Sequence, residues 1–336
     1  MSSDIVKKED YILDAALRPA RWDEYIGQEK IKRNLKILID AAEKRNEPIE
    51  HVLLYGPAGL GKTTLANLIA KETGAFLKVT SGPAIEKVGD LAALLTNMEE
   101  GDVLFIDEVH RLNRAIEEIL YPAMESHVLD IILGKGPSAK TFQLQLPRFT
   151  IVAATTRAGL LSSPFRSRFG ATYKLEFYQL EEIEKIIMRS ANLLKVNIDR
   201  RATKQIATVS RFTPRVANRI LKRVRDYAQV HDADIITEEI TGKALEMMEV
   251  DEIGLETADI KILEAIIKKH NGGPVGLKAI AAACSEEVET IEDLYEPYLM
   301  QIGFLSRSLR GRCATKLAYE HLGIKFSAEQ NQQKLI

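Results

Sequence analysis

Short apolar runs alternate with helical patterns through the first half of the chain. Four runs lie at 51–55, 76–80, 102–106 and 149–155, and residues 172–177 are a candidate fifth. Turn residues or charges bound each run, which is typical of buried parallel strands. Helical patterns lie between them, notably at 62–73 and 113–126. Strands that alternate with helices predict a doubly wound α/β sheet.

The pattern changes after Tyr178, where residues 179–250 predict helices only. A further unit begins near Leu255, with helices predicted at 257–270, 276–284 and 286–301 and an arginine-rich hairpin at 303–316. Three helices followed by a hairpin are typical of a winged-helix domain. We therefore predict an α/β domain at 1–178, a small helical domain at 179–254, a winged helix at 255–326 and a polar tail at 327–336.

An insertion at 128–148 separates the third and fourth predicted strands. Apolar runs at 128–133 and 141–146 flank a Gly-Lys-Gly-Pro turn at 134–137, which predicts a β-hairpin. A protruding hairpin would expose apolar side chains of Ile131, Ile132 and Leu133 and so offer a docking surface. The alternative is a hairpin packed onto the sheet.

Composition narrows the class of protein. With 336 residues, the chain is long enough for two or three domains. The formal net charge of −2, from 46 basic and 48 acidic side chains, excludes a whole-protein electrostatic grip on nucleic acid, so phosphate binding needs a local patch. Two cysteines without metal-ligand spacing fit a reducing cytoplasm. No apolar stretch of about 18 residues or secretory signal pattern is present, which indicates a cytoplasmic protein without a membrane partner.

Residues 56–63 read GPAGLGKT and match GxxxxGK[ST] completely. The motif follows a predicted strand and opens a predicted helix, which is the context that a phosphate-binding loop requires. Glycines let backbone N–H groups turn toward phosphate oxygens, and the helix N-terminus adds positive partial charge. Lys62 is expected to reach the β- and γ-phosphates of ATP, and the Thr63 hydroxyl to bind Mg²⁺.

Polar residues end the next two strands. Asp107 and Glu108 follow the apolar run 103–106, and Thr156 follows the run 149–155. Acids at the carboxyl end of a central strand face the ligand crevice of an α/β sheet. We expect Asp107 to hold Mg²⁺, Glu108 to orient and polarise the attacking water, and Thr156 to contact the γ-phosphate or that water. An acidic pair after a strand is otherwise a solvated cap, but the phosphate loop favours the functional interpretation.

Motifs along the whole chain resemble the RuvB family of AAA+ motors, which drive branch migration of Holliday junctions in bacteria. The stretches that carry the resemblance include RPARWDEYIGQ (18–28), IDEVHRLN (106–113), YPAMES (121–126), AATTRAGLLSSPFRSRFG (153–170), TPRVANRILKRVRDYA (213–228) and GGPVGL (272–277). The similarity covers roughly residues 10–325. It implies an AAA+ P-loop core with a parallel sheet, an all-helical lid and a C-terminal winged helix.

The resemblance also implies roles for individual residues. Leu17 and Arg18 would lie beside the adenine, and Tyr178 would be a hinge residue that touches nucleotide. The phosphates would be held by Gly59, Gly61, Lys62, Thr63 and Thr64. Thr156 would be sensor 1, Arg168 the arginine finger and Arg215 sensor 2. Residues near the nucleotide would include Glu125, Ser126 and His127.

Partners follow from the same resemblance. The family pattern is a homohexameric ring on double-stranded DNA that uses ATP and Mg²⁺ and acts at Holliday junctions. RuvA would dock on the hairpin at 128–148, and RuvC would join in the resolving complex. Two departures stand out, because the family carries proline where this chain has Ala58 and a Thr-Pro pair where it has Ser308 and Leu309.

Charge predicts which part of the winged helix touches DNA. The third predicted helix carries six acids and no Lys or Arg between residues 286 and 296, so phosphates would repel it. The hairpin that follows is basic, and Gly311 would let its backbone pass close to a strand. We therefore expect backbone contacts to DNA from the hairpin arginines, namely Arg307, Arg310 and Arg312. The alternative is a solvated hairpin.

Two other functions fit parts of the sequence. One is an AAA+ loader or remodeller that acts on protein, but the winged helix and the lack of an identifiable aromatic pore loop or peptidase argue against an unfoldase. The other is a DNA-binding regulator that uses ATP only as a switch. Glu108 and Arg168 argue against a switch, because a protein that never turns ATP over needs neither.

Overall fold

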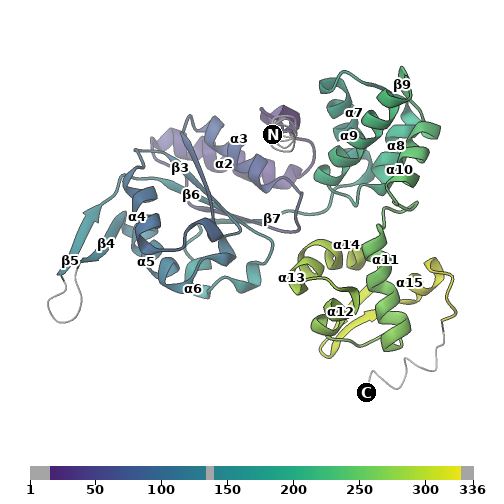
Figure 1. Ribbon diagram of the computed structural model, residues 1–336. Coiled ribbons are helices and arrows are strands. Elements are labelled where there is room, and N and C mark those ends of the chain that lie inside the picture. Colours follow the sequence, from purple (N-terminus) through teal and green to yellow (C-terminus); the bar gives the residue numbers. More distant parts are fainter. Residues whose placement is uncertain (1–15, 134–139, 327–336) are drawn as a thin grey trace, which may run out of the picture. The chain divides into compact units, whose positions relative to one another are not determined.

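A computed structural model describes residues 16–133 and 140–326 (Figure 1). The chain divides into two compact units that meet between Tyr178 and Gln179, and each is described by itself. Within the described ranges, none of the helices has the length and apolar character needed to cross a membrane.

The first unit contains a five-stranded parallel sheet of order β2-β3-β6-β1-β7. Its strands are β1 (Val52–Tyr55), β2 (Leu77–Ser81), β3 (Val103–Asp107), β6 (Thr150–Thr155) and β7 (Ala171–Lys174). All five correspond to the apolar runs in the sequence, and the predicted α/β class is confirmed. The central strands β3, β6 and β1 are the most buried, which explains their continuous apolar character.

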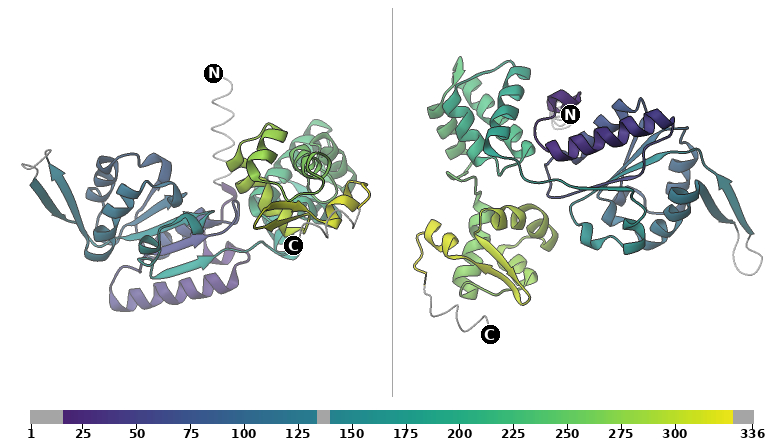
Figure 2. Two further views of the ribbon diagram at one scale, coloured as in Figure 1. Left: turned by 90° about the horizontal axis from the view of Figure 1, so that it is seen from below. Right: turned by 180° about the vertical axis from the view of Figure 1, so that it is seen from behind.

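Helices cover both faces of this sheet (Figures 1 and 2). One face carries α2 (Glu29–Arg45) and α3 (Lys62–Glu72), with α3 packed on β3 and β6. The other face carries α4 (Val88–Thr96), α5 (Arg114–Ser126) and the short α6 (Ser163–Arg166). The connections include four 3₁₀ turns, at Trp22–Glu24, Gly82–Ala84, Val109–Arg111 and Ala158–Leu160.

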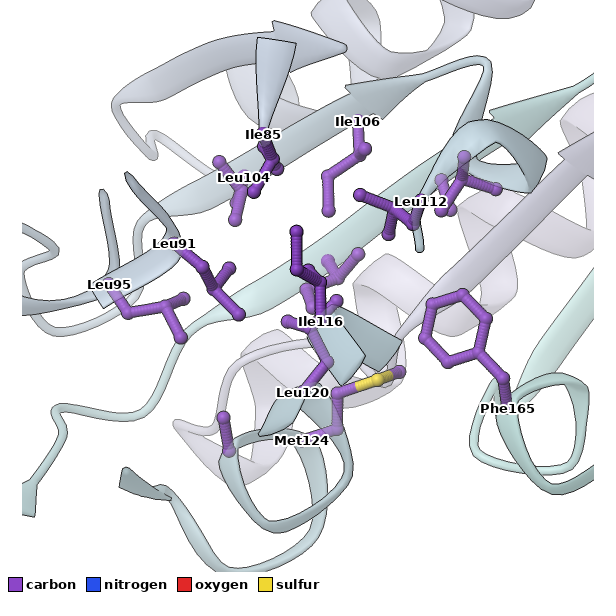
Figure 3. Close-up of a cluster of buried hydrophobic side chains, with 14 of the residues drawn as sticks. Ile85, Leu91, Leu95, Leu104, Ile106, Leu112, Ile116, Leu120, Met124 and Phe165 are labelled. Carbon is purple, nitrogen blue, oxygen red and sulfur yellow. The ribbon is translucent and has the colours of Figure 1, made fainter. Parts of the chain in front are cut away.

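The core beneath α5 fixes the position of that helix (Figure 3). Ile116, Leu120 and Met124 recur at four-residue intervals and face Leu104, Ile106 and other strand residues. Phe165 of α6 packs into the same cluster and is fully buried. Helices α5 and α6 therefore pack into the same hydrophobic core, which fixes the segments that follow them.

The insertion forms an antiparallel hairpin of β4 (Val128–Leu133) and β5 (Lys140–Gln145), while its expected turn at 134–137 lies outside the described residues. The two strands project from the body of the first unit (Figures 1 and 2). Leu129 and Leu146 at the base are buried in the core, whereas Phe142 and Leu144 are 52% and 40% exposed. The hairpin is thus anchored at its base and carries exposed apolar side chains farther out.

The second unit begins with a helical bundle of α7 (Leu180–Leu193), α8 (Arg200–Val209), α9 (Pro214–Val230) and α10 (Glu238–Met247). The prediction of helices only was wrong in one detail. The loops after α7 and before α10 pair as two short parallel strands, β8 (Asn197–Ile198) and β9 (Ile235–Ile236). Two-residue strands leave no periodic signal, and this pair is held by backbone contacts and the buried Ile236.

The rest of the second unit is a winged helix. Its first helix, α11 (Thr257–Glu264), runs into a π-helical turn (Ala265–Lys269), and α12 (Leu277–Cys284) follows. The third helical stretch combines α13 (Val288–Thr290), a π-turn (Ile291–Tyr295) and α14 (Glu296–Gln301). The wing consists of β10 (Leu305–Ser308) and β11 (Gly311–Ala314). The predicted three helices and hairpin are all present.

A last helix, α15 (Lys316–His321), was not predicted, since Lys316 had been assigned to the hairpin. The Thr315 hydroxyl donates to the Gly303 carbonyl at 2.6 Å and ends the wing. Ala318 and Tyr319 of α15 are buried in the winged-helix core. Six residues are too few for a clear helical period, so tertiary packing decides the outcome.

A buried ion pair joins the helical bundle to the winged helix. The Arg211 guanidinium donates to Asp259 at 2.6 Å and to the Gly254 carbonyl at 2.9 Å, and Asp259 is fully buried. Burial raises the pKa of Asp259 despite the neighbouring Arg211. Removing either partner of such a pair typically costs about 3–5 kcal/mol, so this contact ties the two subdomains together.

Candidate active site

Three neighbouring strands bring the predicted chemical groups to one edge of the sheet. The phosphate loop follows β1, Asp107 and Glu108 follow β3, and Thr156 follows β6. Because β3, β6 and β1 are adjacent and parallel, their carboxyl ends meet at the same edge. This is the edge at which α/β sheets bind their ligands.

The phosphate loop has the backbone conformation that its glycines predict. Gly61 caps the N-terminus of α3 with φ of 98°, in the region that favours glycine. A Cβ there would lie 2.7 Å from the Tyr25 hydroxyl oxygen, so the position has no room for a side chain. The Lys62 ammonium donates to the carbonyls of Gly56 and Pro57 at 2.8 and 2.9 Å, which holds it over the loop.

Two buried tyrosines support the loop from behind. The Tyr178 hydroxyl donates to the Leu60 carbonyl at 3.2 Å, and its oxygen lies 3.3 Å from the Tyr25 hydroxyl. Burial, together with Tyr178, raises the pKa of Tyr25 well above its usual range, so the Tyr25 hydroxyl stays protonated. Tyr178 therefore lies against the phosphate loop at the end of the first unit. No role was predicted for Tyr25, and only its place in the stretch 18–28 pointed to it.

Glu108 has a strained backbone and a positioned side chain. Its φ of 48° lies in the left-handed region, which costs roughly 1–3 kcal/mol for a residue other than glycine. The carboxylate Oε2 lies 3.4 Å from the Thr156 hydroxyl and 3.2 Å from His110 Nδ1. The Asp107 carboxylate accepts the Glu108 backbone N–H at 3.0 Å. Glu108 and Thr156, predicted separately, thus lie side by side.

His110 joins this group, although no role was predicted for it. Its side chain is nearly buried, and Nδ1 lies 2.9 Å from the Thr155 hydroxyl as well as 3.2 Å from Glu108. A lone pair on Nδ1 would repel the carboxylate, so the arrangement favours a proton on this nitrogen. His110 then donates toward both neighbours and restrains Glu108. A single histidine in a short helical turn gives no sequence signal of such a contact.

The residues at this edge fit a magnesium ion bound together with ATP. Mg²⁺ is usually held by one or two protein oxygens, substrate phosphates and waters, not by a cage of protein ligands. Thr63, in the first turn of α3, and Asp107, at the end of β3, supply one hydroxyl and one carboxylate. The described residues contain no cluster of three or more His, Cys, Asp or Glu that could hold a metal alone.

A second cluster forms around Arg168, just after α6. The guanidinium carbon lies 4.2 Å from the centre of the Tyr121 ring, Nε lies 3.3 Å from Glu125, and Nη1 donates to the Pro164 carbonyl at 2.6 Å. A cation over an aromatic face is stabilised by about 0.5–2 kcal/mol. Arg168 and His127 also line a cavity of about 460 Å³, to which residues 56–64 do not contribute.

The structure thus distributes the predicted nucleotide-binding residues over several parts of the chain. Glu125, Ser126 and His127 lie at the end of α5, where Glu125 contacts Arg168, whereas the phosphate loop lies between β1 and α3. His51 also lines the cavity, and burial lowers the pKa of this histidine to about 4, so it is neutral at physiological pH. Leu17 is buried and Arg18 is exposed. Arg215 is exposed in the first turn of α9, in the second unit.

The wing is a candidate nucleic-acid interface. Arg307 and Arg310 are exposed, and Leu309 at the tip is fully exposed. Gly311 has φ of 145° and lies so close to the Val275 backbone that a Cβ would collide with it. The wing backbone therefore passes close to the segment before α12, whereas the expected approach to a strand stays a prediction.

Arg312 differs from the other wing arginines, because it has a partner inside the protein. Its Nε and Nη2 donate to Glu296 at 3.0 to 3.3 Å, and both residues are buried. No hydrogen bond to the described residues engages Nη1, which is the nitrogen that could meet a phosphate. Arg312 is therefore not a free surface arginine, and the DNA contact expected of it stays a prediction. Glu296, assigned to an acidic surface, is instead an internal partner of the wing.

Comparison with known proteins identifies the family. Three family models match: the P-loop domain of the Holliday junction DNA helicase RuvB at residues 17–175, the RuvB AAA lid domain at 178–251 and the RuvB C-terminal winged-helix domain at 252–323. The solved structure of the Thermotoga maritima RuvB Holliday junction branch migration motor is 50% identical, with a TM-score of 0.86 over 93% of this chain and 100% of that chain. A mutant of the same Thermotoga protein matches with a TM-score of 0.87, 50% identity and coverage of 93% and 99%. The chain therefore belongs to the RuvB family.

Proposed function

We propose that this protein is an ATP-driven motor that forms a hexameric ring on double-stranded DNA and, with RuvA, drives branch migration of Holliday junctions in recombination and repair. One observation carries the proposal: the phosphate loop, Asp107, Glu108 and Thr156 meet at one sheet edge in a RuvB-family chain that also has a winged helix with an exposed basic wing. RuvC in the resolving complex and a cytoplasmic location follow from the same family membership.

The loop between β1 and α3 would bind ATP. Backbone N–H groups of the loop and the Lys62 ammonium would hold the β- and γ-phosphates, with Gly59, Gly61 and Thr64 shaping the turn. Thr63 and Asp107 would hold Mg²⁺, which would supply positive charge to neutralise the phosphates. Leu17 and Arg18 would lie beside the adenine. Tyr178, which hydrogen-bonds to the loop, would be a hinge residue that touches the nucleotide.

Hydrolysis requires a water aligned with the γ-phosphate. Glu108 would accept a hydrogen bond from that water, and Thr156 would hold the phosphate or the water from the adjacent strand. The contacts of Glu108 with Thr156 and His110 support this assignment, because they restrain the carboxylate before substrate arrives. Arg215 in the lid would sense the γ-phosphate.

The cluster around Arg168 would serve the neighbouring subunit. In a ring, Arg168 would enter the next subunit's ATP site and stabilise charge on the transferring phosphoryl group. Its separation from the phosphate loop of its own subunit, in a cluster with Glu125 and a cavity lined by His127, supports action in trans.

DNA would be held by the wing through its phosphates, since a motor that moves along DNA needs contacts that ignore sequence. The exposed Arg307 and Arg310 would contact phosphates directly. Arg312 would donate a hydrogen bond from Nη1 to a phosphate, while Glu296 holds its Nε and Nη2. The exposed acids Glu287 and Glu289 support contact through the wing and not the third helix.

Replacing Arg307 with Ala is expected to weaken duplex binding similarly on unrelated sequences. One lost phosphate contact should flatten the slope of log affinity against log salt by about 0.9. Arg312→Ala should weaken binding too, and should also lower the melting temperature because it leaves Glu296 buried without its partner. Fluorescence anisotropy at several salt concentrations measures the slope. Normal binding by Arg307→Ala, together with loss of binding by the control Glu287→Ala, would overturn the wing assignment.

RuvA docking is assigned to the hairpin of β4 and β5. The candidates Ile131, Ile132 and Leu133 have side chains outside the described set, but Phe142 and Leu144 on β5 are exposed. An apolar surface on a projecting element fits a protein partner, whereas a hairpin packed onto the sheet would bury it.

The function is tested by ATPase and branch-migration assays on a synthetic four-way junction. Junction DNA with RuvA should stimulate ATP hydrolysis and move the branch point. A Phe142→Ser, Leu144→Ser variant should lose the stimulation by RuvA but keep its basal ATPase, because neither residue lies near the phosphate loop. A remodeller of protein substrates would show no junction response, and an ATP switch would show no turnover.

A further inference from the structure

The guanidinium of Arg168 rests in a cradle built mainly by one helix. Tyr121 and Glu125 are four residues apart on α5, so they occupy the same side of that helix. Tyr121 contributes the face of its ring at 4.2 Å, and Glu125 contributes a carboxylate oxygen at 3.3 Å from Nε. Only 19% of the Arg168 side chain remains exposed. A surface arginine would normally be mobile, whereas this one is held on three sides.

The Tyr121 ring is itself fixed by a small polar network. Its hydroxyl lies 3.0 Å from the Ser162 hydroxyl and 3.3 Å from the Glu117 carboxylate, and Ser162 donates to Glu117 at 2.7 Å. Glu117 is 6% exposed, and Ser162 caps α6, the helix just before Arg168. The network therefore ties the ring to the same short segment that carries the arginine.

We propose that Tyr121 is a positioning residue for ATP hydrolysis, acting as the platform that aims Arg168. The cradle contacts the face of the guanidinium and engages Nη1, and Glu125 lies beside the buried Nε without a hydrogen bond. No hydrogen bond to the described residues engages Nη2, which is left for a phosphate oxygen. Arg168 would then meet the transferring phosphoryl group without first being ordered, and ordering a long side chain costs rotamer entropy. This inference rests on the proposed role of Arg168 in trans.

The test compares Tyr121→Leu, which removes the ring, with Tyr121→Phe, which keeps the ring face and removes the hydroxyl. Tyr121→Leu should lower kcat by about 10- to 100-fold, because a misplaced group of this kind costs about that much. KM for ATP should stay within about twofold, since the phosphate loop is intact. Tyr121→Phe should restore kcat in part, because it keeps the ring face but loses the hydroxyl contacts with Ser162 and Glu117. Tyr173→Leu, on the edge strand β7, is the matched control for loss of a tyrosine ring.

Two further measurements separate positioning from damage to the fold. Combining Tyr121→Leu with Arg168→Ala should lower kcat no further than Arg168→Ala alone, because the ring acts only through the arginine. Mixing Tyr121→Leu subunits with Lys62→Ala subunits should regain ATPase, since each mixed interface can pair an intact loop with an intact finger. Melting temperatures show whether the variants are folded.

The outcomes distinguish the inference from the function on which it rests. Three results would each overturn the role of Tyr121. The first is a normal kcat for Tyr121→Leu, and the second is additive losses of kcat in the double variant. The third is a Tyr121→Leu mixture that regains no ATPase although the Arg168→Ala mixture does. If Arg168→Ala mixtures fail to regain activity although mixed rings form, the intersubunit assignment is wrong. The double variant then still decides whether Tyr121 acts through Arg168.

Discussion

Replacing Glu108 with Gln is expected to leave ATP bound and to slow its hydrolysis by about 10²- to 10⁴-fold. Gln keeps the size of the side chain and can still meet the Thr156 hydroxyl and His110, but it lacks the charge that polarises water. Nucleotide binding by calorimetry and single-turnover hydrolysis separate the two effects. Binding without hydrolysis places Glu108 in the chemical step.

Lys62→Ala provides the contrasting result, because it removes the side-chain cation that hydrogen-bonds to the loop carbonyls at Gly56 and Pro57. This variant should lose nucleotide binding or turnover altogether. Glu72→Gln, at the exposed end of α3, is the matched control for the loss of one carboxylate. A Glu108→Gln protein that hydrolyses ATP as fast as Glu72→Gln would rule out the proposed role of Glu108.

The residues proposed to bind and hydrolyse ATP could be recognised in the sequence because their signals are local. The phosphate loop is eight consecutive residues, and Glu108 and Thr156 each end an apolar strand. Their closeness follows from the rule that parallel strands present their carboxyl ends at one edge. The hydrogen bonds of Tyr25 and His110 depend on side-chain packing between distant segments, and no pattern in the sequence encodes them.

The wing shows a different limit. Charge correctly separated the acidic helix from the basic hairpin, but it treated all arginines of the hairpin alike. Arg312 of β11 faces Glu296 of α14, while its neighbour Gly311 lies against the Val275 backbone. Both are tertiary contacts, which a count of charges along the sequence does not contain. The short elements β8, β9 and α15 were missed for a related reason, since tertiary contacts and not periodicity define them.

Arg168→Ala is expected to bind ATP normally and to lose hydrolysis by about 10³-fold or more, which is the usual contribution of an arginine finger. The effect should arise at the neighbour's site, because Arg168 clusters with Tyr121 and Glu125 and not with the loop of its own subunit. Arg166→Ala is the matched control, since Arg166 lies two residues away and is exposed. It should retain most of the activity.

Mixing experiments show on which side of the interface Arg168 acts. Arg168→Ala rings and Lys62→Ala rings should each be inactive, but mixed rings contain interfaces at which an intact loop meets an intact finger. Activity should therefore rise on mixing and pass through a maximum near equal proportions. A finger acting within its own subunit predicts no recovery at any ratio, because every subunit would carry one defect. Mass spectrometry of the rings verifies that the two variants mix, so a flat activity profile in verified mixed rings would reject the intersubunit site.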